Sequence, residues 1–227
     1  MFIRFGVISL ICLVLPFGYE KVSPFRLGKC KIYSFENRAI AKEIPDSLNY
    51  PFTFLAEGTQ AYVFLSQDKK HVLKLFKNVK GVEKIVDACR LAYEIRDLTG
   101  VIFVHAEREA ALPIIHLKDQ LGRVHPMDPA HMCFVLQKRA DPFFRTIRTA
   151  SKEEQVQLIA SFYALLKEMN RRGIANLDNS LGRNYGFING RAVAIDFGKF
   201  AYAPQLTEER EAHMIRRLNK WLQRNKI

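Results

Sequence analysis

Short apolar runs separated by tight polar turns dominate the middle of the chain. Residues 54–65 contain two such runs on either side of a turn of small residues, and residues 71–76 form a third run after a polar turn. Residues 112–117 and 133–137 have the same texture. Runs of this length, bounded by turn residues, are typical of β-strands, so the pattern predicts five strands in this region.

The pattern changes to a helical period in three places. Apolar side chains recur at steps of three and four residues over 81–98, which predicts an amphipathic helix that Gly100 ends. Ser151 and Glu154 have the spacing of a capping box and open a second predicted helix, which carries an apolar stripe. A third helix is expected to begin at Thr207.

The dipeptide Asn189-Gly190 lies between two short apolar runs near the end of the chain. Both positions of a two-residue hairpin turn must accept positive φ, and Asn-Gly does so readily. The sequence therefore predicts an antiparallel hairpin with Asn184 just before its first strand and Asp196 just after its second. An amide oxygen and a carboxylate at one end of a hairpin are ligands that suit Mg²⁺.

The N-terminus has a different composition. Residues 1–18 contain Arg4 and then an apolar run at 5–17, too short for a comfortable membrane span but typical of a signal peptide. No A-x-A-like cleavage site follows, so an uncleaved membrane anchor is an alternative, and a buried strand or helix is another. We expect an exported or membrane-anchored protein, or a cytoplasmic one if the leader is not functional. Residues 19–50 show no sustained period and predict an irregular extension.

Composition limits the choice of partners. The 227 residues suffice for one large domain or two small lobes, and the net charge of +12 favours anionic partners such as nucleotide phosphates, nucleic acid or a membrane. Basic residues are scattered, without the basic and aromatic alternation of a nucleic-acid groove, so no specific nucleic-acid partner is expected. The cysteines show no metal-binding spacing and are expected to be buried free thiols: Cys12, Cys30, Cys89 and Cys133.

Three motifs together resemble those of the protein kinase-like superfamily. Asp196-Phe197-Gly198 matches the D-F-G motif, and Val72-Leu73-Lys74 resembles V-A-I-K. The stretch at 55–64 resembles a degenerate Gly-rich loop, in which only Gly58 remains of three glycines. The resemblance covers residues 52–200, and no A-P-E motif follows it.

The resemblance implies an α+β, two-lobed fold. Residues 51–140 would form a five-stranded N-lobe with one helix in the position of the kinase αC helix, and residues 141–227 a reduced helical C-lobe. It also implies that ATP and Mg²⁺ bind between the lobes. The expected site residues are Gly58, Lys74, Glu94 and Gln137 for the nucleotide, Asp178 as catalytic base, and Asn184 and Asp196 for the metal.

Lysine is rarely placed in an apolar strand without a partner. Glu94 is the best-placed carboxylate on the following helix to pair with Lys74, with Glu83 as its rival. A lysine whose ammonium extends to solvent from an edge strand is the alternative for Lys74, and a solvated helix face is the alternative for either glutamate.

The catalytic loop departs from the family pattern. Asp178 lies six residues before Asn184 instead of five, His-Arg is absent, and the usual position is held by Asn179, which cannot act as a base. Asp178 as a simple turn carboxylate therefore remains open. We expect an atypical kinase-like protein that transfers phosphate to a protein or small-molecule acceptor. The alternatives are a pseudokinase used for binding or scaffolding and an envelope-anchored structural protein with an accidental D-F-G.

Overall fold

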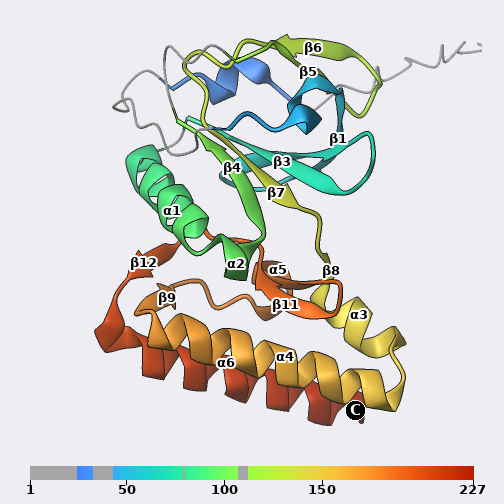
Figure 1. Cartoon of the computed structure of the whole chain (residues 1–227), viewed down its shortest axis with the longest axis vertical. Helices are drawn as coiled ribbons and strands as arrows, with labels where there is room; N and C mark the ends of the chain where they lie inside the picture. Colours follow the sequence, from blue (N-terminus) through green and yellow to red (C-terminus); the bar gives the residue numbers. More distant parts are fainter. Residues whose placement is uncertain (1–24, 33–42, 79, 107–111) are drawn as a thin grey trace, which may run out of the picture.

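A computed structural model of the chain describes residues 25–32, 43–78, 80–106 and 112–227. It is an α+β structure in which a β-sheet lies above a layer of helices (Figure 1). The predicted leader at 1–18 lies outside the described residues, as does part of the predicted extension at 19–50, which contains the short 3₁₀ helices Leu27–Cys30 and Asp46–Asn49. In the part of the chain that the structure describes, each helix is too short or too polar to cross a bilayer.

The sheet contains more strands than the sequence pattern predicts. Its members are β1 (Phe52–Glu57), β2 (Ala61–Ser66), β3 (His71–Phe76), β4 (Val101–His105), β5 (Ile115–Lys118), β6 (Val124–Met127) and β7 (Phe134–Lys138). They are ordered β4-β7-β3-β2-β1-β5-β6, and only the β1–β5 pair is parallel among the described strands. The prediction of five strands is therefore wrong, because β4 follows the helix directly and β6 contains Pro126, which is tolerated at a sheet edge.

Both faces of β3 are covered, which explains its nearly continuous apolar sequence. Leu73 and Leu75 are buried on one face, in the cluster that contains Phe25. Phe76 is buried in the second cluster, together with buried side chains of the helix at 82–94. Lys74 alternates with Leu73 and Leu75 and therefore points to this second side, where a polar group needs a partner.

The predicted helix at 81–98 is broken into two. α1 (Val82–Glu94) packs its buried side chains on the sheet, and α2 (Arg96–Thr99) follows after a break at Ile95, whose φ and ψ are −102° and 37°. Gly100 ends α2 in the left-handed conformation, with φ of +69°, as its position predicts.

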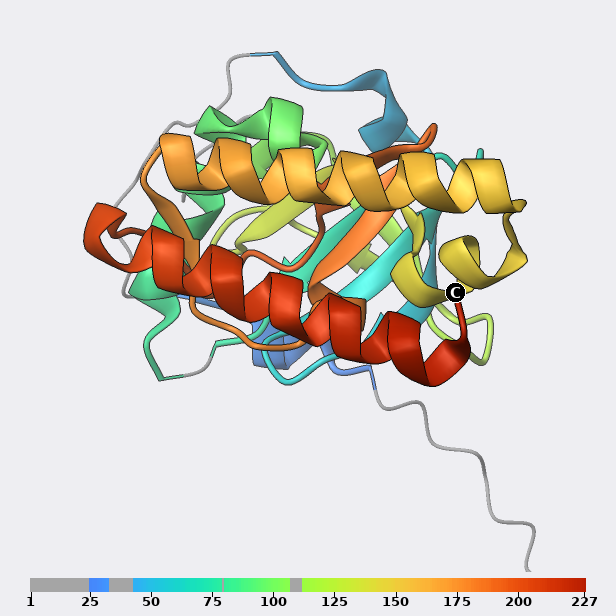
Figure 2. The ribbon, with the colours of Figure 1, turned by 90° about the horizontal axis from the view of Figure 1, so that it is seen from below.

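The C-terminal part is built on two long helices that lie side by side below the sheet, α4 (Lys152–Arg171) and α6 (Pro204–Asn225) (Figure 2). Shorter elements fill the space between these helices and the sheet. They are β8 (Asp141–Pro142), α3 (Phe143–Thr149), β9 (Ile174–Asn176), α5 (Leu181–Asn184), β10 (Tyr185–Ile188), β11 (Arg191–Ala194) and β12 (Phe200–Tyr202). β8, β10 and β11 form one small sheet, and β9 pairs with β12.

The local signals of the C-terminal part are confirmed. Ser151 Oγ accepts from the Glu154 N–H at 3.2 Å, and the Glu154 carboxylate accepts from the Ser151 N–H at 2.8 Å, which completes the capping box. Asn189 and Gly190 have φ of +50° and +76°, as the hairpin turn requires. α6 begins three residues before the expected Thr207, with Pro204 in its first turn.

The cysteine prediction is confirmed for the described residues. Cys30, Cys89 and Cys133 are buried free thiols, and Cys12 lies outside the described ranges. Burial raises the pKa of the Cys30 thiol to about 12, so this group stays protonated at neutral pH.

Candidate functional site

The open end of the β10–β11 hairpin brings Asn184 and Asp196 together. The register pairs Tyr185 with Ala194, so the residues just outside this pair lie next to each other. The Asn184 carbonyl accepts from the Ile195 N–H at 2.7 Å and from the Asp196 N–H at 3.3 Å. The backbones of the two residues meet as predicted, and the contact of both side-chain oxygens with one Mg²⁺ stays a prediction.

The Asn184 side chain has one unused acceptor. It is 1% exposed, its amide nitrogen donates to the Asp178 carbonyl at 3.3 Å, and its Oδ1 is buried without a hydrogen-bond partner among the described residues. Leaving such a group unsatisfied costs about 1–3 kcal/mol. A buried amide oxygen without a donor suits a cation or an ordered water.

Asp196 completes the pair with an exposed carboxylate. Its Oδ1 accepts from the Gly198 N–H at 3.3 Å, which fixes the turn that follows. Two oxygen ligands leave most of the coordination sphere of Mg²⁺ to water and phosphate oxygens, as is usual for this ion. The described residues contain no group of three His, Cys, Asp or Glu side chains that could hold a metal ion by themselves. The donor set therefore fits a hydrated Mg²⁺ bound together with phosphates.

The loop between β9 and α5 is tied to this pair. The Asn176 amide nitrogen donates to the Asp196 carbonyl at 3.4 Å, and the Asn176 Oδ1 accepts from the Asp178 N–H at 3.0 Å. Asn176 therefore connects the loop that carries the predicted base to the segment that carries the predicted metal ligand. Asn176 was not predicted as a site residue, because its hydrogen bond is to a segment 20 residues away in the sequence.

Asp178 is held in a fixed orientation. Its Oδ1 accepts from the Ser180 N–H at 2.8 Å, and Lys199 Nζ lies 3.7 Å from Oδ2. The Ser180 hydrogen bond lowers the pKa of the Asp178 carboxyl most, with further contributions from Asn184, Lys199 and Arg183, whereas partial burial opposes the shift. The carboxylate is thus ionised at neutral pH and can accept a hydroxyl hydrogen bond, but it is a weak base.

Lys74 connects the upper sheet to the segment of Asp196. Its ammonium donates to the Ile195 carbonyl and lies 4.8 Å from the centroid of the Phe197 ring. Burial lowers the pKa of Lys74, and the charge of the Asp196 carboxylate opposes this shift. A lysine ammonium next to Asp196 and the hairpin end is well placed to contact phosphate oxygens that a metal at Asn184 and Asp196 would share.

The predicted ion pair between Lys74 and Glu94 is wrong. The Glu94 side chain is 60% exposed and lies 3.8 Å from Arg90 Nε on its own helix. The residue of α1 close enough to affect the pKa of Lys74 is Cys89. Glu94 lies five residues after Cys89, so its side chain points in a direction about 140° away from that of Cys89 around the helix axis. The rival Glu83 lies in the first turn of α1 with an exposed side chain.

The β1–β2 loop is folded on itself. The Gly58 N–H donates to the Ala61 carbonyl at 2.8 Å, and Lys77 Nζ donates to the Gly58 carbonyl at 2.8 Å and to the Glu57 carboxylate at 2.6 Å. The predicted contact of Gly58 with phosphate requires its N–H to leave Ala61. That contact stays a prediction.

Gln60 was not predicted as a site residue, but its side chain lies near the D-F-G turn. A Cβ atom added at Gly198 would lie 2.5 Å from the Gln60 Oε1 and 3.7 Å from the Asp196 Oδ1. The side chain of Gln60 therefore extends from the β1–β2 loop to the D-F-G turn, beside the predicted metal ligand.

Gln137 points into the interior. It is 1% exposed, and its amide nitrogen donates to the Thr99 carbonyl at 2.6 Å and to the Ala194 carbonyl at 3.4 Å. The side chain thus ties the sheet to α2 and to the hairpin. The N–H groups of Lys138 and Arg139 donate to the Gly100 and Lys70 carbonyls. The predicted nucleotide contact at Gln137 stays a prediction.

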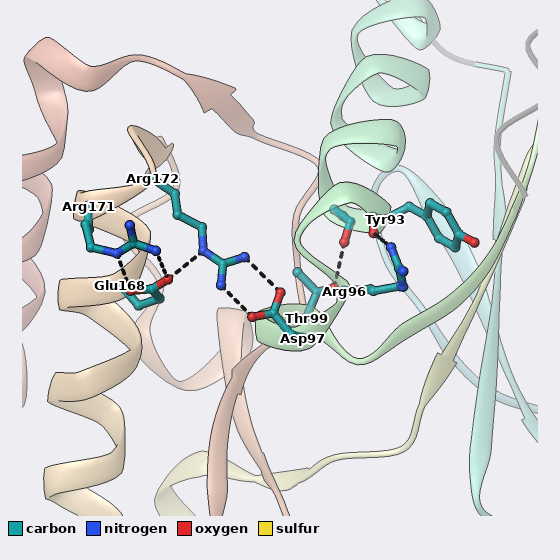
Figure 3. A network of polar contacts seen from close by, with 8 residues as sticks. Tyr93, Arg96, Asp97, Thr99, Glu168, Arg171 and Arg172 are labelled. Atoms are coloured by element: carbon teal, nitrogen blue, oxygen red, sulfur yellow. Dashed lines mark hydrogen bonds and ion pairs between the residues drawn. The ribbon is translucent and has the colours of Figure 1, made fainter.

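A polar network connects α2 with the end of α4 (Figure 3). Arg172, next to the end of α4, makes two hydrogen bonds to the Asp97 carboxylate of α2, at 2.9 and 2.6 Å. Glu168 accepts from both Arg171 and Arg172, and these bonds lower the pKa of Glu168 to about 2. The network fixes the position of α4, and hence of β9 and the Asp178 loop, relative to α2.

Comparison with known proteins adds no assignment. No family model matches the chain, and a comparison with curated proteins found no match.

Proposed function

We propose that the chain is a compact, atypical kinase-like protein that binds ATP with Mg²⁺ between the seven-stranded sheet and the helices α4 and α6. The observation that carries the proposal is the buried Oδ1 of Asn184, which has no hydrogen-bond partner among the described residues. The backbone of Asn184 is bonded to that of Asp196 and of Ile195, and the Ile195 carbonyl accepts from the ammonium of Lys74. Lys74 and Asp196 are thus close in space, although 122 residues separate them in the sequence.

Each residue has a distinct part in this proposal. Asn184 and Asp196 hold the metal, Lys74 contacts phosphate oxygens, and Asp178 orients the acceptor hydroxyl. A bound Mg²⁺ neutralises charge on the phosphates during transfer. Because the pKa of Asp178 is low, the carboxylate positions the hydroxyl and takes its proton only late in the reaction.

A pseudokinase is the second candidate, and the β1–β2 loop favours it. The Gly58 N–H is engaged with Ala61, and Gln60 lies against Gly198, so the phosphate region is covered. Lys199 also pairs with Asp178, which occupies one oxygen of the predicted base. In this alternative the same fold binds a partner, with or without nucleotide, and turns over no phosphate.

Thermal unfolding with ATP, with Mg²⁺ and with both tests the proposal. A ligand at about 100 times its dissociation constant stabilises the folded state by about 2.7 kcal/mol. We expect little effect of Mg²⁺ alone, and mutual enhancement when both are present. Asp196→Asn should weaken this coupling, because the neutral amide loses the charge that attracts the cation, while the hairpin stays paired.

Two further variants separate the candidates. Asp46→Asn removes an exposed carboxylate outside the site and should leave the coupling unchanged. Asp178→Asn should leave nucleotide binding intact and abolish turnover if the protein is an active kinase. Binding of ATP and Mg²⁺ without turnover across protein and small-molecule acceptors would favour the pseudokinase. Binding of neither ligand in titration calorimetry would reject both candidates.

A further inference from the structure

Three consecutive polar residues, 178–180, each contact a cation from a different segment of the chain. The contacts are Lys199 Nζ to Asp178 Oδ2 at 3.7 Å, an Arg210 terminal nitrogen to Asn179 Oδ1 at 2.8 Å, and Arg183 Nε to Ser180 Oγ at 2.9 Å. Lys199 follows the D-F-G motif, Arg183 lies in α5 and Arg210 in α6. The structure thus places three cations along the loop that carries the predicted base.

Their charge is only partly balanced. Within the described ranges, Asp178 is the one carboxylate within ion-pair distance of any of the three. Asp178 pairs directly with one of the three cations, Lys199, and Glu211 lines the same cavity as Arg210. Arg171 and Arg172 at the end of α4 differ, because they share the carboxylates of Glu168 and Asp97.

The cations retain unused donors. Arg183 is exposed and makes its contact through Nε, so its two terminal nitrogens bond to no other described residue. Arg210 uses one terminal nitrogen, and its Nε is buried without a partner in the described part of the chain. The Lys199 side chain is 58% exposed. Guanidinium forks with free donors match the oxygen atoms of phosphate, and a phosphate monoester carries a charge of about −1.5 to −2 at neutral pH.

We propose that the phosphoacceptor is a phosphate monoester that also carries a hydroxyl group. Its phosphate binds between Lys199, Arg183 and Arg210, and its hydroxyl lies at the Asp178 carboxylate. The assignment of an acceptor rests on the proposed kinase-like function, whereas the phosphate site itself rests only on the three cations. Three cations with unused donors favour a dianion over a neutral alcohol or a monocarboxylate.

Titration calorimetry with three related probes tests the site. Glycerol 3-phosphate, glycerate and glycerol share a hydroxylated backbone and carry a phosphate, a carboxylate and no charge. We expect glycerol 3-phosphate to bind, glycerate to bind more weakly and glycerol to show no heat. Because charge-assisted hydrogen bonds are lost, Arg183→Gln and Lys199→Gln should each weaken glycerol 3-phosphate binding about tenfold.

A matched control is Lys152→Gln. This exposed lysine opens α4, which is 20 residues long, so it lies about 30 Å along the helix from the Asp178 end. The control removes the same charge and should leave the affinity for glycerol 3-phosphate unchanged. Equal losses in all three variants would show a nonspecific effect of net charge and overturn the proposal.

The remaining outcomes are equally decisive. Glycerate binding as tightly as glycerol 3-phosphate would contradict a dianion site, and so would unchanged affinity in Arg183→Gln and Lys199→Gln. Displacement of glycerol 3-phosphate by saturating ATP and Mg²⁺ would place it in the nucleotide region and overturn the acceptor site. If ATP fails to bind while glycerol 3-phosphate binds and the variants weaken it, the phosphate site is supported and the proposed kinase-like function alone is lost.

Discussion

Replacing Lys74 with Met separates the structural from the functional contribution of the buried lysine. Methionine keeps the length and apolar stem of the side chain and removes its charge. The lost hydrogen bond to the Ile195 carbonyl has a charged donor, worth about 1.5–3 kcal/mol. The contact with the Phe197 ring, at 4.8 Å, adds about 0.5–2 kcal/mol.

A gain of similar size opposes this loss. Apolar replacement of buried ionic groups is often neutral or stabilises by about 1–4 kcal/mol, because the charge no longer has to be desolvated. Burial lowers the pKa of Lys74, which shows that the ammonium is desolvated in the folded state. We therefore expect Lys74→Met to change the free energy of unfolding by less than about 1.5 kcal/mol in either direction. Nucleotide binding should be lost.

The pH dependence gives a second test of the same substitution. The folded-state pKa of Lys74 lies below its ordinary value of 10.5, so above the folded-state pKa the unfolded chain binds more protons. The cost of the buried charge is present at neutral pH and disappears as the pH rises toward 10.5. The stability of the Met variant relative to the unaltered protein should therefore decrease over this range.

Urea unfolding and thermal shifts with ATP and Mg²⁺ measure the two effects, with Lys118→Met as the control. Lys118 lies exposed on β5, far along the sheet order from β3, and its loss should affect neither stability nor nucleotide binding. A loss of more than about 3 kcal/mol in Lys74→Met would mean that the lysine is a structural link between the sheet and the D-F-G segment. Retained ATP binding would refute the assignment of Lys74 to phosphate.

Further predictions follow from close contacts and from the polar network. Gly198→Ala should lower the free energy of unfolding in urea by less than about 1 kcal/mol, because the new Cβ meets the movable end of Gln60 at 2.5 Å. Gly186→Ala should lower it by about 1–3 kcal/mol, because its Cβ meets the backbone of β8 at 2.7 Å. Equal losses in the two variants would contradict this difference. Asp97→Asn should destabilise by about 0.5–1 kcal/mol, less in high salt, because its bonds to Arg172 are partly exposed. These bonds lower the pKa of Asp97. Their contribution to the free energy of unfolding should therefore be present above the unfolded-state pKa near 3.8 and be lost as the pH falls through the folded-state pKa. A difference in stability between Asp97→Asn and the unaltered protein that does not depend on pH would refute this.

Elements defined by local chemistry were predictable from the sequence. The hairpin follows from the positive φ that Asn189 and Gly190 accept, and the start of α4 follows from the capping box of Ser151 and Glu154. The convergence of Asn184 and Asp196 follows in turn from the hairpin, since its strand ends must meet. These features depend on neighbours within a few residues.

Features that depend on distant contacts were not predictable. The place of Lys74 in an apolar strand correctly predicted that its ammonium has a polar partner. That partner is the Ile195 carbonyl, 121 residues away, and not a carboxylate on the next helix. The break at Ile95 and the face of α1 that meets the sheet decide that Glu94 is exposed. No residue pattern in the helix specifies that face more finely than a stripe of apolar positions.

Under the proposed function, metal binding and phosphate transfer make separate demands on this site. Metal binding would use the Oδ1 of Asn184, which has no partner among the described residues, and the carboxylate of Asp196, and the Asn184 side chain is held by the Asp178 carbonyl. Turnover also needs an acceptor hydroxyl at Asp178, whose low pKa and contact with Lys199 make it a weak base. An acceptor phosphate that engages Lys199 would draw that ammonium away from Asp178 and raise the basicity of the carboxylate. Under the proposed function, the acceptor's own charge therefore helps to activate the residue that receives its proton, and a neutral alcohol lacks this effect.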